Sequence, residues 1–188
     1  MKNITVRPAT EEDSVYAVQI VEEMFSSAII RGSGISRRTP ASIIEKMKVG
    51  KAVIALNGKN EWVGFSYLEV WANGEFVSNS GLIVSPAYRG QGIAKAIKKK
   101  IFELSRKIYP DAKIFSITTG LAIMQMNARL GFLPVTYSEI PQEEAFWKGC
   151  KSCVNYSILE GKGCKNCLCT AMLFKPGKTT KKKKMNLA

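Results

Sequence analysis

The stretch LIVSPAYRGQGIA, residues 82–94, decides how this chain folds and what it can bind. An apolar strand leads into a turn with glycines at 90 and 92, and an amphipathic helix begins at Ile93. Glycines and a small Ala94 at a helix start let the backbone approach a ligand closely. Free N–H groups and the positive end of the helix dipole then face that ligand, which predicts an anion-binding site. The alternative is a plain glycine turn before a structural helix.

Two familiar phosphate-binding motifs do not fit this turn. A P-loop requires Gly-Lys-Ser/Thr after the glycines, and here Ile93 and Ala94 follow. A dinucleotide fingerprint requires a third glycine or alanine where this chain has Lys95. The turn is therefore predicted to bind an anion, but through neither of these two motifs.

Length and composition indicate one globular domain. The chain has 188 residues, of which 46% are hydrophobic and 23% charged, enough to bury a core without disulfides. No apolar run approaches the roughly 18 residues that a membrane span requires, so no membrane partner is expected. Residues 1–8 contain no apolar leader segment. We therefore expect a cytoplasmic protein with reduced thiols.

The net charge of +13 is concentrated at the C-terminus. Residues 175–188 hold six lysines and no acidic residue, which predicts a disordered basic tail. Salt-sensitive contact with RNA or membrane is the alternative role for this tail. Nucleic acid is an unlikely partner, because no aromatic residue that could stack on bases follows Phe174. The remaining positive charge suits a ligand with several phosphates or carboxylates.

The pattern of apolar and turn residues predicts the element order β-α-α-β-β-β-α-β-α-β, followed by a last strand. In the first helix, apolar residues recur at helical spacing at Val15, Val18, Val21, Met24 and Phe25. In the helix from Ile93, Lys98 is predicted to lie off the apolar stripe. The expected elements are a strand at 4–6, a helix after Thr10, a loop at 26–38, a helix from Thr39-Pro40, strands at 52–56, 62–70 and 75–84, a helix at 93–108, a strand at 113–118, a helix at 121–130, and strands at 134–140 and 168–174.

The turn resembles that of the GNAT acyltransferases, in which a Q/R-x-x-G-x-G/A motif holds the pyrophosphate of CoA. Arg89, Gly92 and Ala94 match it, and the similarity covers approximately residues 4–140. The resemblance implies an α/β GNAT fold with a mixed, mostly antiparallel central sheet flanked by helices. It also implies a backbone N–H near Val84 that polarises the thioester carbonyl. The implied CoA-binding residues are Leu82, Ile83, Val84, Arg89, Gly90, Gln91, Gly92, Ile93 and Ala94.

This resemblance divides the chain into three parts. Residues 1–145 are expected to form the acyltransferase core. Residues 146–174 are expected to form a cysteine-rich loop and a last strand that complete the same domain, and residues 175–188 form the tail. Nothing in the sequence indicates the oligomeric state.

A narrower resemblance is to the acetyltransferase domain of N-acetylglutamate synthase and related amino-acid acyltransferases. It rests on Arg37-Arg38-Thr39, Thr118-Thr119 and Gly131-Phe132. It implies transfer of an acetyl or succinyl group from acetyl-CoA or another acyl-CoA to the amine of a small anionic amino acid such as glutamate, as in arginine biosynthesis. Arg37 and Arg38 would then hold the acceptor carboxylate beside Thr118. The alternative for the arginines is a solvated charged loop.

Other acceptors and roles remain open at this point. Acylation of a protein, a peptide or a polyamine is the alternative within the enzyme class. A GNAT-like module that binds CoA without turnover is the alternative outside it. The positive charge of the chain favours small anionic acceptors over polycationic ones.

The chain departs from the family where proton transfer is expected. Many GNAT enzymes have a tyrosine four residues before the Gly-Phe pair that protonates the leaving thiolate, and here that position is Asn127. An acidic residue of related synthases corresponds to Ser78. The absence of histidine removes the commonest general base. Glu69 and Glu75 are then the nearest carboxylates, and a base relayed by water would suffice because an α-amine has a pKa of about 8.

Five cysteines cluster near the C-terminus, four of them as Cys150-x-x-Cys153 and Cys164-x-x-Cys167. Two such pairs can hold a structural zinc ion, with these four thiolates as ligands. Small buried thiols are the second alternative, because Cys167 and Cys169 alternate along an expected strand. A catalytic or redox thiol is the third.

Overall fold

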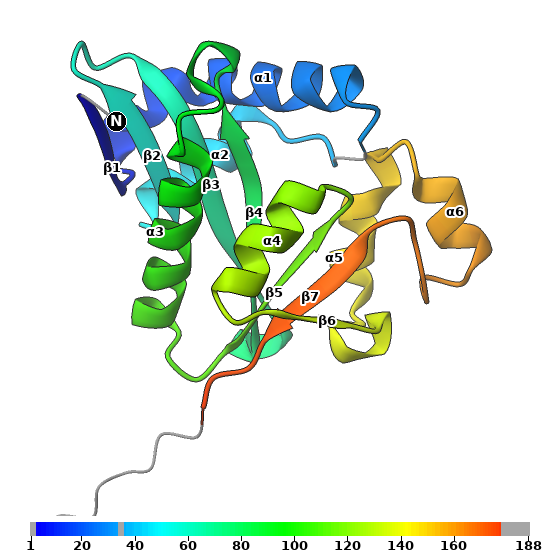
Figure 1. The fold of residues 1–188 in the computed structure, drawn as a ribbon. Helices are drawn as coiled ribbons and strands as arrows, with labels where there is room; N and C mark the ends of the chain where they lie inside the picture. Colours follow the sequence, from blue (N-terminus) through cyan, green and yellow to red (C-terminus); the bar gives the residue numbers. More distant parts are fainter. Residues whose placement is uncertain (1–2, 34–35, 178–188) are drawn as a thin grey trace, which may run out of the picture.

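The structure is a computed structural model that describes residues 3–33 and 36–177. Its centre is a seven-stranded sheet with the order β1-β2-β3-β4-β5-β7-β6 (Figure 1). β4 and β5 pair in parallel, and the other neighbours pair antiparallel. The predicted fold class, a mixed and mostly antiparallel sheet flanked by helices, is confirmed. The strands are β1 (Ile4–Pro8), β2 (Ala52–Asn57), β3 (Trp62–Trp71), β4 (Phe76–Val84), β5 (Lys113–Thr118), β6 (Leu133–Val135) and β7 (Thr170–Phe174).

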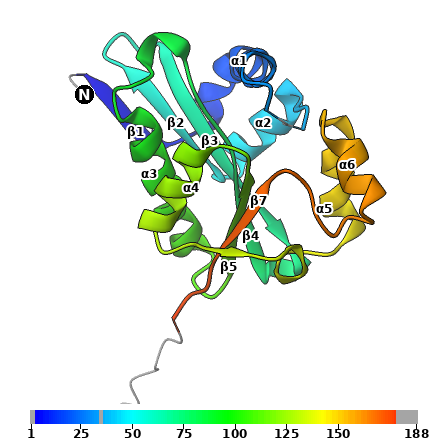
Figure 2. The ribbon, with the colours of Figure 1, turned by 45° about the vertical axis from the view of Figure 1, so that its right-hand side comes forward.

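Helices cover both faces of this sheet. α3 and α4 lie on one face and α1 and α2 on the other, as the two views in Figures 1 and 2 show. Short 3-10 turns join several elements. The α-helices are α1 (Ala17–Ile30), α2 (Pro40–Lys48), α3 (Ile93–Ile108), α4 (Leu121–Arg129), α5 (Glu144–Lys148) and α6 (Tyr156–Gly161).

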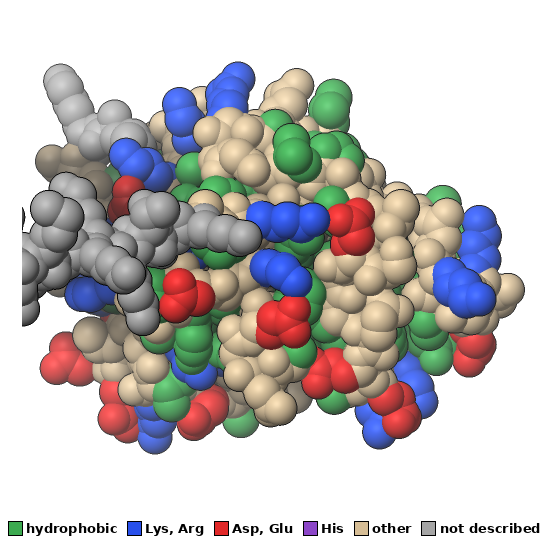
Figure 3. Space-filling model, turned by 90° about the horizontal axis from the view of Figure 1, so that it is seen from below, with side chains coloured by type: hydrophobic (Ala, Val, Ile, Leu, Met, Phe, Trp, Pro, Cys, Tyr) green, Lys and Arg blue, Asp and Glu red, His purple; other side chains and the backbone are tan. Residues whose placement is uncertain are grey.

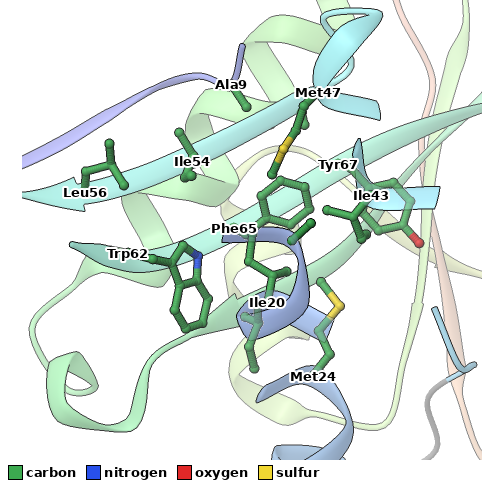
Figure 4. Close-up of a cluster of buried hydrophobic side chains, with 13 residues drawn as sticks. Ala9, Ile20, Met24, Ile43, Met47, Ile54, Leu56, Trp62, Phe65 and Tyr67 are labelled. Carbon is green, nitrogen blue, oxygen red and sulfur yellow. The ribbon is translucent and has the colours of Figure 1, made fainter. Parts of the chain in front are cut away.

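The core under α1 and α2 consists mainly of apolar side chains, and the ring of Tyr67 is part of it. Ile20 and Met24 of α1 and Ile43 of α2 pack on Phe65 and Tyr67 of β3 (Figure 4). Ile20, Ile43, Phe65 and Tyr67 are each at most 1% exposed. The Tyr67 ring is thus fixed by packing while its hydroxyl lies at the margin of the cluster.

The core under α3 and α4 follows the predicted apolar stripe of α3. Ile93, Ile97 and Ile101 are buried against β-sheet residues that include Val77 and Ile114. The strong segregation of apolar and polar residues around α3 is what drives this docking. Because α3 starts directly after the glycine turn, its docking fixes the position of the turn.

β4 changes partners along its length. It pairs with β5 only over Phe76–Ser78, so the two strands diverge beyond Ser78. Its pairing with β3 shifts register opposite the segment from Phe65 to Tyr67, where Gly81 adopts φ +63°. A Cβ atom at Gly81 would lie 2.4 Å from the Tyr67 ring, so this bulge requires glycine.

The C-terminal segment completes the sheet. β7 lies between β5 and β6, with Phe115 opposite Leu173 and Leu133 opposite the same Leu173. The segment before β7 carries α5 and α6 and packs through Phe146 and Trp147 on Phe115 and its neighbours. The chain from 136 to 169 therefore forms a lobe beside β5, which we call the cysteine-rich lobe or cysteine lobe.

Several local predictions were wrong. α1 extends to Ile30, so residues 26–30 of the predicted loop are helical, and positions 34–35 of that loop lie outside the described residues. Val15 and Val18 are 77% and 55% exposed, because the helix turns other residues to the core. The strand expected at 134–140 ends at Val135, and β7 begins at Thr170 rather than 168. The predicted basic tail lies outside the described residues from 178 onward.

Charges on the face seen from below are mixed. Acidic and basic side chains are interspersed there wherever the surface is visible (Figure 3). Ion pairs such as Lys113–Glu75 at 2.8 Å and Lys175–Glu139 at 3.2 Å neutralise part of the excess positive charge. That visible face offers no continuous basic patch. Within residues 3–33 and 36–177, no helix has the length and apolar character needed to cross a membrane.

Candidate functional site

The turn between β4 and α3 is held open by its two glycines. Gly90 and Gly92 have φ values of +77° and +79°, a region that favours glycine, and a Cβ atom at either would meet nothing within 4 Å. The glycines are thus required by backbone conformation and not by crowding. Gly92 caps α3 in a left-handed conformation. The concave side of this turn is therefore free to receive a ligand.

A run of backbone N–H groups at this turn has no acceptor. The first internal bond of α3 is donated by the Ala96 N–H to the Gly92 carbonyl oxygen, at 3.2 Å. Within the described part of the chain, the N–H groups of residues 90–95 donate to no backbone or side-chain oxygen. Together with the helix dipole, they form a site suited to a pyrophosphate or a similar anion. Residues 90–94 of this run are among the predicted CoA-binding residues, and Lys95 was not predicted.

Arg89 fastens the turn to the rest of the protein. Its Nε donates to the Val84 carbonyl oxygen at 3.1 Å, and one terminal nitrogen lies 2.9 Å from Glu23 Oε1 on α1. The same nitrogen donates to the Ser27 hydroxyl. Arg89 thus bonds to protein groups through Nε and one terminal nitrogen, which positions the turn.

Positive charge is crowded beside the turn. The pKa of Arg31 is lowered, first by burial and second by the nearby charge of Arg89, and only partly raised by Glu23. Arg89 pairs with Glu23 at 2.9 Å, and the charge of the same carboxylate acts on Arg31. Such an excess of positive charge favours an anionic ligand at the adjacent turn.

The free edge of β4 leads away from the turn into the region where β4 and β5 diverge. The Ser85 N–H donates to the Val63 carbonyl oxygen of β3 at 2.8 Å. Since consecutive N–H groups of a strand point to opposite edges, the Val84 and Leu82 N–H groups point away from β3. Ile83 packs its side chain into the core under α1. The strand end thus presents backbone donors next to the glycine turn.

Arg38 and Tyr67 meet on the other face of the sheet. Arg38 Nε donates to the Tyr67 hydroxyl, and its guanidinium carbon lies 5.7 Å from the centre of the Tyr67 ring. Burial raises the pKa of Tyr67, so the hydroxyl stays neutral and accepts this bond. Arg37 stacks instead on the Phe25 ring, at 4.4 Å. The two predicted arginines are therefore held by aromatic side chains of β3 and α1.

The cysteine-rich lobe contacts this arginine segment. The Arg37 backbone N–H donates to Ser152 Oγ at 2.8 Å, across 115 positions of sequence. The charge of Arg38 also acts on the Cys150 thiol and opposes the rise of its pKa. The lobe and the arginine segment thus form one continuous surface.

The other predicted site residues are dispersed. Glu69 pairs with Lys46 of α2 at 3.0 Å and lies one pleat from Tyr67, on the side of the arginines. Glu75 precedes β4 at the end opposite Val84 and pairs with Lys113. Thr118 ends β5, where its Oγ1 accepts the Gly120 N–H at 3.0 Å and shapes the approach to α4. Of the two carboxylates, Glu69 is the one near the arginines.

Four of the five cysteine side chains line a small apolar cavity of about 30 Å³. Burial, followed by the neighbouring thiols, raises the pKa of Cys150 to about 11 and that of Cys169 to about 12. These two thiols are therefore protonated at neutral pH and poor nucleophiles. The cavity is lined by Cys150, Cys153, Cys167 and Cys169 together with aromatic residues that include Tyr137 and Trp147.

The zinc hypothesis gains no support from this arrangement. Among the described residues, no group of three or more Cys, His, Asp or Glu side chains is disposed to hold a metal ion. Cys164, one of the four predicted ligands, does not line the cavity that the other three share. All five cysteines are free thiols, and the expected strand alternation of Cys167 and Cys169 is wrong because β7 begins after them.

Two buried polar groups were missed by the sequence analysis. Nothing in the sequence around Tyr67 indicated a polar role, because an aromatic residue in a predicted strand is ordinarily assigned to the hydrophobic core. Lys98 was placed off the apolar stripe of α3, yet it is only 2% exposed, so that prediction was wrong. Its position between Ile97 and Ile101 was the available signal, since both neighbours on that face are fully buried.

The sequence and the structure both match known acetyltransferases. A family model described as "Acetyltransferase (GNAT) family" matches residues 28–132. No curated protein matches the sequence closely enough to count as a relative. The family match includes α2, the glycine turn, α3 and α4.

Solved structures of acetyltransferases share the fold at low identity. The N-acetylglutamate synthase from Neisseria gonorrhoeae, complexed with coenzyme A and N-acetyl-glutamate, superposes with a TM-score of 0.65 at 15% identity, and covers 95% of this chain. This chain spans only 36% of that synthase. A phosphinothricin acetyltransferase from Sinorhizobium meliloti in complex with AcCoA gives 0.62 at 16% identity, covering 95% of this chain and 91% of its own.

A third structure is of similar size. The diaminobutyrate acetyltransferase from Paenibacillus lautus, in complex with L-2,4-diaminobutyric acid and coenzyme A, gives a TM-score of 0.60 at 12% identity. The match covers 94% of this chain and 96% of that one. At such identities these likenesses establish the fold, and they agree with the family match.

Proposed function

Because the chain belongs to the acetyltransferase (GNAT) family, we propose that it transfers an acetyl or succinyl group from acyl-CoA to the amine of a small anionic amino acid, with glutamate the first candidate. The observation that carries the CoA part of this proposal is the run of unbonded N–H groups at residues 90–95. The chain is a GNAT-type acetyltransferase, and the identity of the acceptor is the part that we propose.

The cofactor would lie along β4. Its pyrophosphate would accept bonds from the glycine turn, as the open backbone there allows. Its pantetheine arm would follow the free edge of β4 where β4 and β5 diverge. The N–H groups of Leu82 and Val84 would then stabilise the oxyanion that forms on the thioester carbonyl.

The acceptor would lie on the α1 and α2 face. Arg38, oriented by Tyr67, would hold a carboxylate, with Arg37 beside it on the same segment. The synthase from Neisseria gonorrhoeae holds N-acetyl-glutamate, and the enzyme from Paenibacillus lautus holds an amino acid with a second amine. The charge of the arginines favours the first class of acceptor here.

Glu69 is the carboxylate best placed to receive the amine proton. It shares the side of β3 with Tyr67, and its charge acts to raise the pKa of that tyrosine. A water molecule between Glu69 and the amine would relay the proton, a modest demand on an amine of pKa about 8. The cysteine lobe would close the same site through Ser152.

A thiol-release assay tests this function. The protein is assayed with acetyl-CoA and succinyl-CoA against a panel of amino acids, polyamines and peptides. We expect release only with an acidic amino acid, and Arg38→Ala should raise the acceptor KM far more than the acyl-CoA KM. Tight CoA binding without thiol release would make the protein a binding module, and release only with polyamines or peptides would overturn the acceptor class.

A further inference from the structure

Lys98 of α3 is buried without a counter-ion. It is 2% exposed, and within the described residues no acidic side chain or carbonyl oxygen accepts a bond from its ammonium group. Its Nζ lies 5.2 Å from the centre of the Phe132 ring. Burying an unpaired ammonium group is costly. The other buried residues of α3 are three isoleucines and Ser105, so Lys98 is the one charged residue among them.

The position of Lys98 along the sheet is set by a hydrogen bond further down the helix. Asn79 Nδ2 of β4 donates to Ser105 Oγ of α3 at 2.8 Å. Lys98 lies seven residues before Ser105, about two turns along the same face and roughly 10 Å nearer the glycine turn. Asn79 directly follows the last residue of β4 that pairs with β5. Lys98 therefore lies beside the stretch where β4 and β5 have diverged.

Asn127 of α4 is bonded through its backbone to Phe132, the residue whose ring faces Lys98. Its backbone carbonyl oxygen accepts the Phe132 N–H at 3.1 Å, and its side chain is fully buried. The Nδ2 atom contacts Met172 Sδ at 3.6 Å, while Oδ1 has no partner within the described residues. This is the position at which the resemblance to GNAT enzymes implies a tyrosine. Lys98 of α3 and Asn127 of α4 are thus two buried, incompletely bonded polar residues, and both contact Phe132, the first through the ring and the second through the backbone.

We propose that Lys98 is the catalytic acid of the reaction, donating a proton to the sulfur of the leaving CoA thiolate. This inference rests on the proposed function. The acceptor amine forms the new C–N bond, the C–S bond breaks with its electron pair on sulfur, and the ammonium group of Lys98 gives sulfur its proton. The amine loses one proton to the base, and solvent returns one to Lys98. The products are the N-acyl amino acid and free CoA thiol.

The acidity of Lys98 suits this step. Burial lowers its pKa from 10.5 to about 7, and no charged group of the described residues contributes to that shift. An alkyl thiol has a pKa of about 8.5, so proton transfer from Lys98 to the thiolate is downhill. An ordinary solvated lysine would be a weaker acid than the thiol it must protonate. The burial of Lys98 therefore lowers the stability of the fold and at the same time makes its ammonium group acidic enough to protonate the thiolate.

The primary test compares Lys98→Met with Lys99→Met. Lys99 is the next residue, is 71% exposed and makes only a 3.8 Å surface pair with Glu103. In the thiol-release assay, we expect kcat of Lys98→Met to fall by roughly 100-fold or more, as loss of a general acid does. The Kd of CoA, measured by calorimetry, should stay the same, and Lys99→Met should match the wild type. Equal kcat in Lys98→Met and the wild type would overturn the role of Lys98.

A pH profile and a rescue separate catalysis from packing. In the wild type, kcat at saturating substrates should decline as pH rises through about 7, because Lys98 loses its proton. This limb should be absent in Lys98→Met, and Asn127→Tyr should restore at least tenfold of the lost rate in that background. A limb that persists without Lys98, or a rescue that fails in a folded double variant, would overturn the proposal. A wild type without thiol release would overturn the proposed function itself.

Discussion

On the sheet face covered by α3 and α4, the groups proposed to hold CoA are backbone N–H groups from one short stretch, residues 82–95. On the face covered by α1 and α2, the proposed acceptor site is assembled from side chains of separate segments. Arg38, Tyr67 and Ser152 come from the loop before α2, from β3 and from the cysteine lobe. The proposed CoA site depends on the backbone conformation of one segment, whereas the proposed acceptor site depends on which separate segments the fold brings into contact.

The difference teaches where each kind of specificity resides. A pyrophosphate can be bound by any backbone that holds its N–H groups open, so glycine spacing suffices. A carboxylate must be met by guanidinium groups at fixed distances, so the supports of those groups matter as much as the groups themselves. Tyr67 and Ser152 supply that support, and neither is near Arg38 in the sequence.

The largest expected effect concerns stability on the CoA face. Lys98→Met should stabilise the protein at pH 6 by on the order of 5 kcal/mol, because one pKa unit corresponds to about 1.4 kcal/mol and the pKa of Lys98 falls from 10.5 to about 7. Between those values the unfolded chain binds the extra proton, so wild-type stability rises with pH across this window and is lowest below it. Urea unfolding at pH 6 and pH 10 measures this, with Lys99→Met as control. A gain that does not shrink toward pH 10 would contradict it.

Next in size is the loss of CoA binding on substitution of Gly92. Gly92→Val places a β-branched residue at φ +79°, so the turn must change conformation. We expect the Kd of CoA to rise by at least about 100-fold, or roughly 2.7 kcal/mol. Calorimetry on the folded variant measures this.

Gly74→Val provides the matched control for that prediction. Gly74 has φ +95° and also has open space around its Cβ position, so the backbone strain is comparable, but it lies at the other end of β4. CoA binding should be unchanged in Gly74→Val. Equal losses in the two variants would mean that strain alone, and not the turn, governs CoA affinity.

A smaller effect is expected from Tyr67→Phe on the acceptor face. The variant keeps the ring but leaves Arg38 Nε without its acceptor, a loss of about 1 kcal/mol. The acceptor KM should rise about fivefold, with the acyl-CoA KM unchanged. Tyr16→Phe, which removes a hydroxyl bonded to the Asn60 carbonyl oxygen, should change neither. If both substrates lose affinity in Tyr67→Phe, the two faces are not independent.

The smallest effect is expected from Ser152→Ala, which removes the link between the cysteine lobe and Arg37. The bond is 2.8 Å long but exposed, so its loss should raise the acceptor KM only about two- to threefold. Ser138→Ala, at another exposed serine of the same lobe, serves as the control. Steady-state kinetics at varied acceptor concentration detects the change. No difference between the two variants would exclude the lobe from the acceptor site.

Local sequence patterns determined much of this protein. The strand from Lys113 to Thr118 and the helix from Ile93 to Ile108 lie where the patterns predict them, and the α/β class follows from the order of the elements. The glycine turn could be recognised because its function depends on neighbouring residues of one stretch. The two glycines adopt positive φ values at no steric cost because they have no Cβ atom.

Only the tertiary structure decided the contacts between distant segments. The cysteine-rich lobe is followed by β7, which pairs between β5 and β6, and the lobe brings Ser152 to Arg37 across 115 positions. Lys98 was wrongly predicted to lie off the apolar stripe because helical spacing gives the direction of a side chain but not how far the neighbouring structure extends over the helix. Here α4 and Phe132 extend over the side of α3 that carries Lys98. Spacing along a chain reflects local backbone geometry, whereas burial and pairing depend on which surfaces the whole fold brings together.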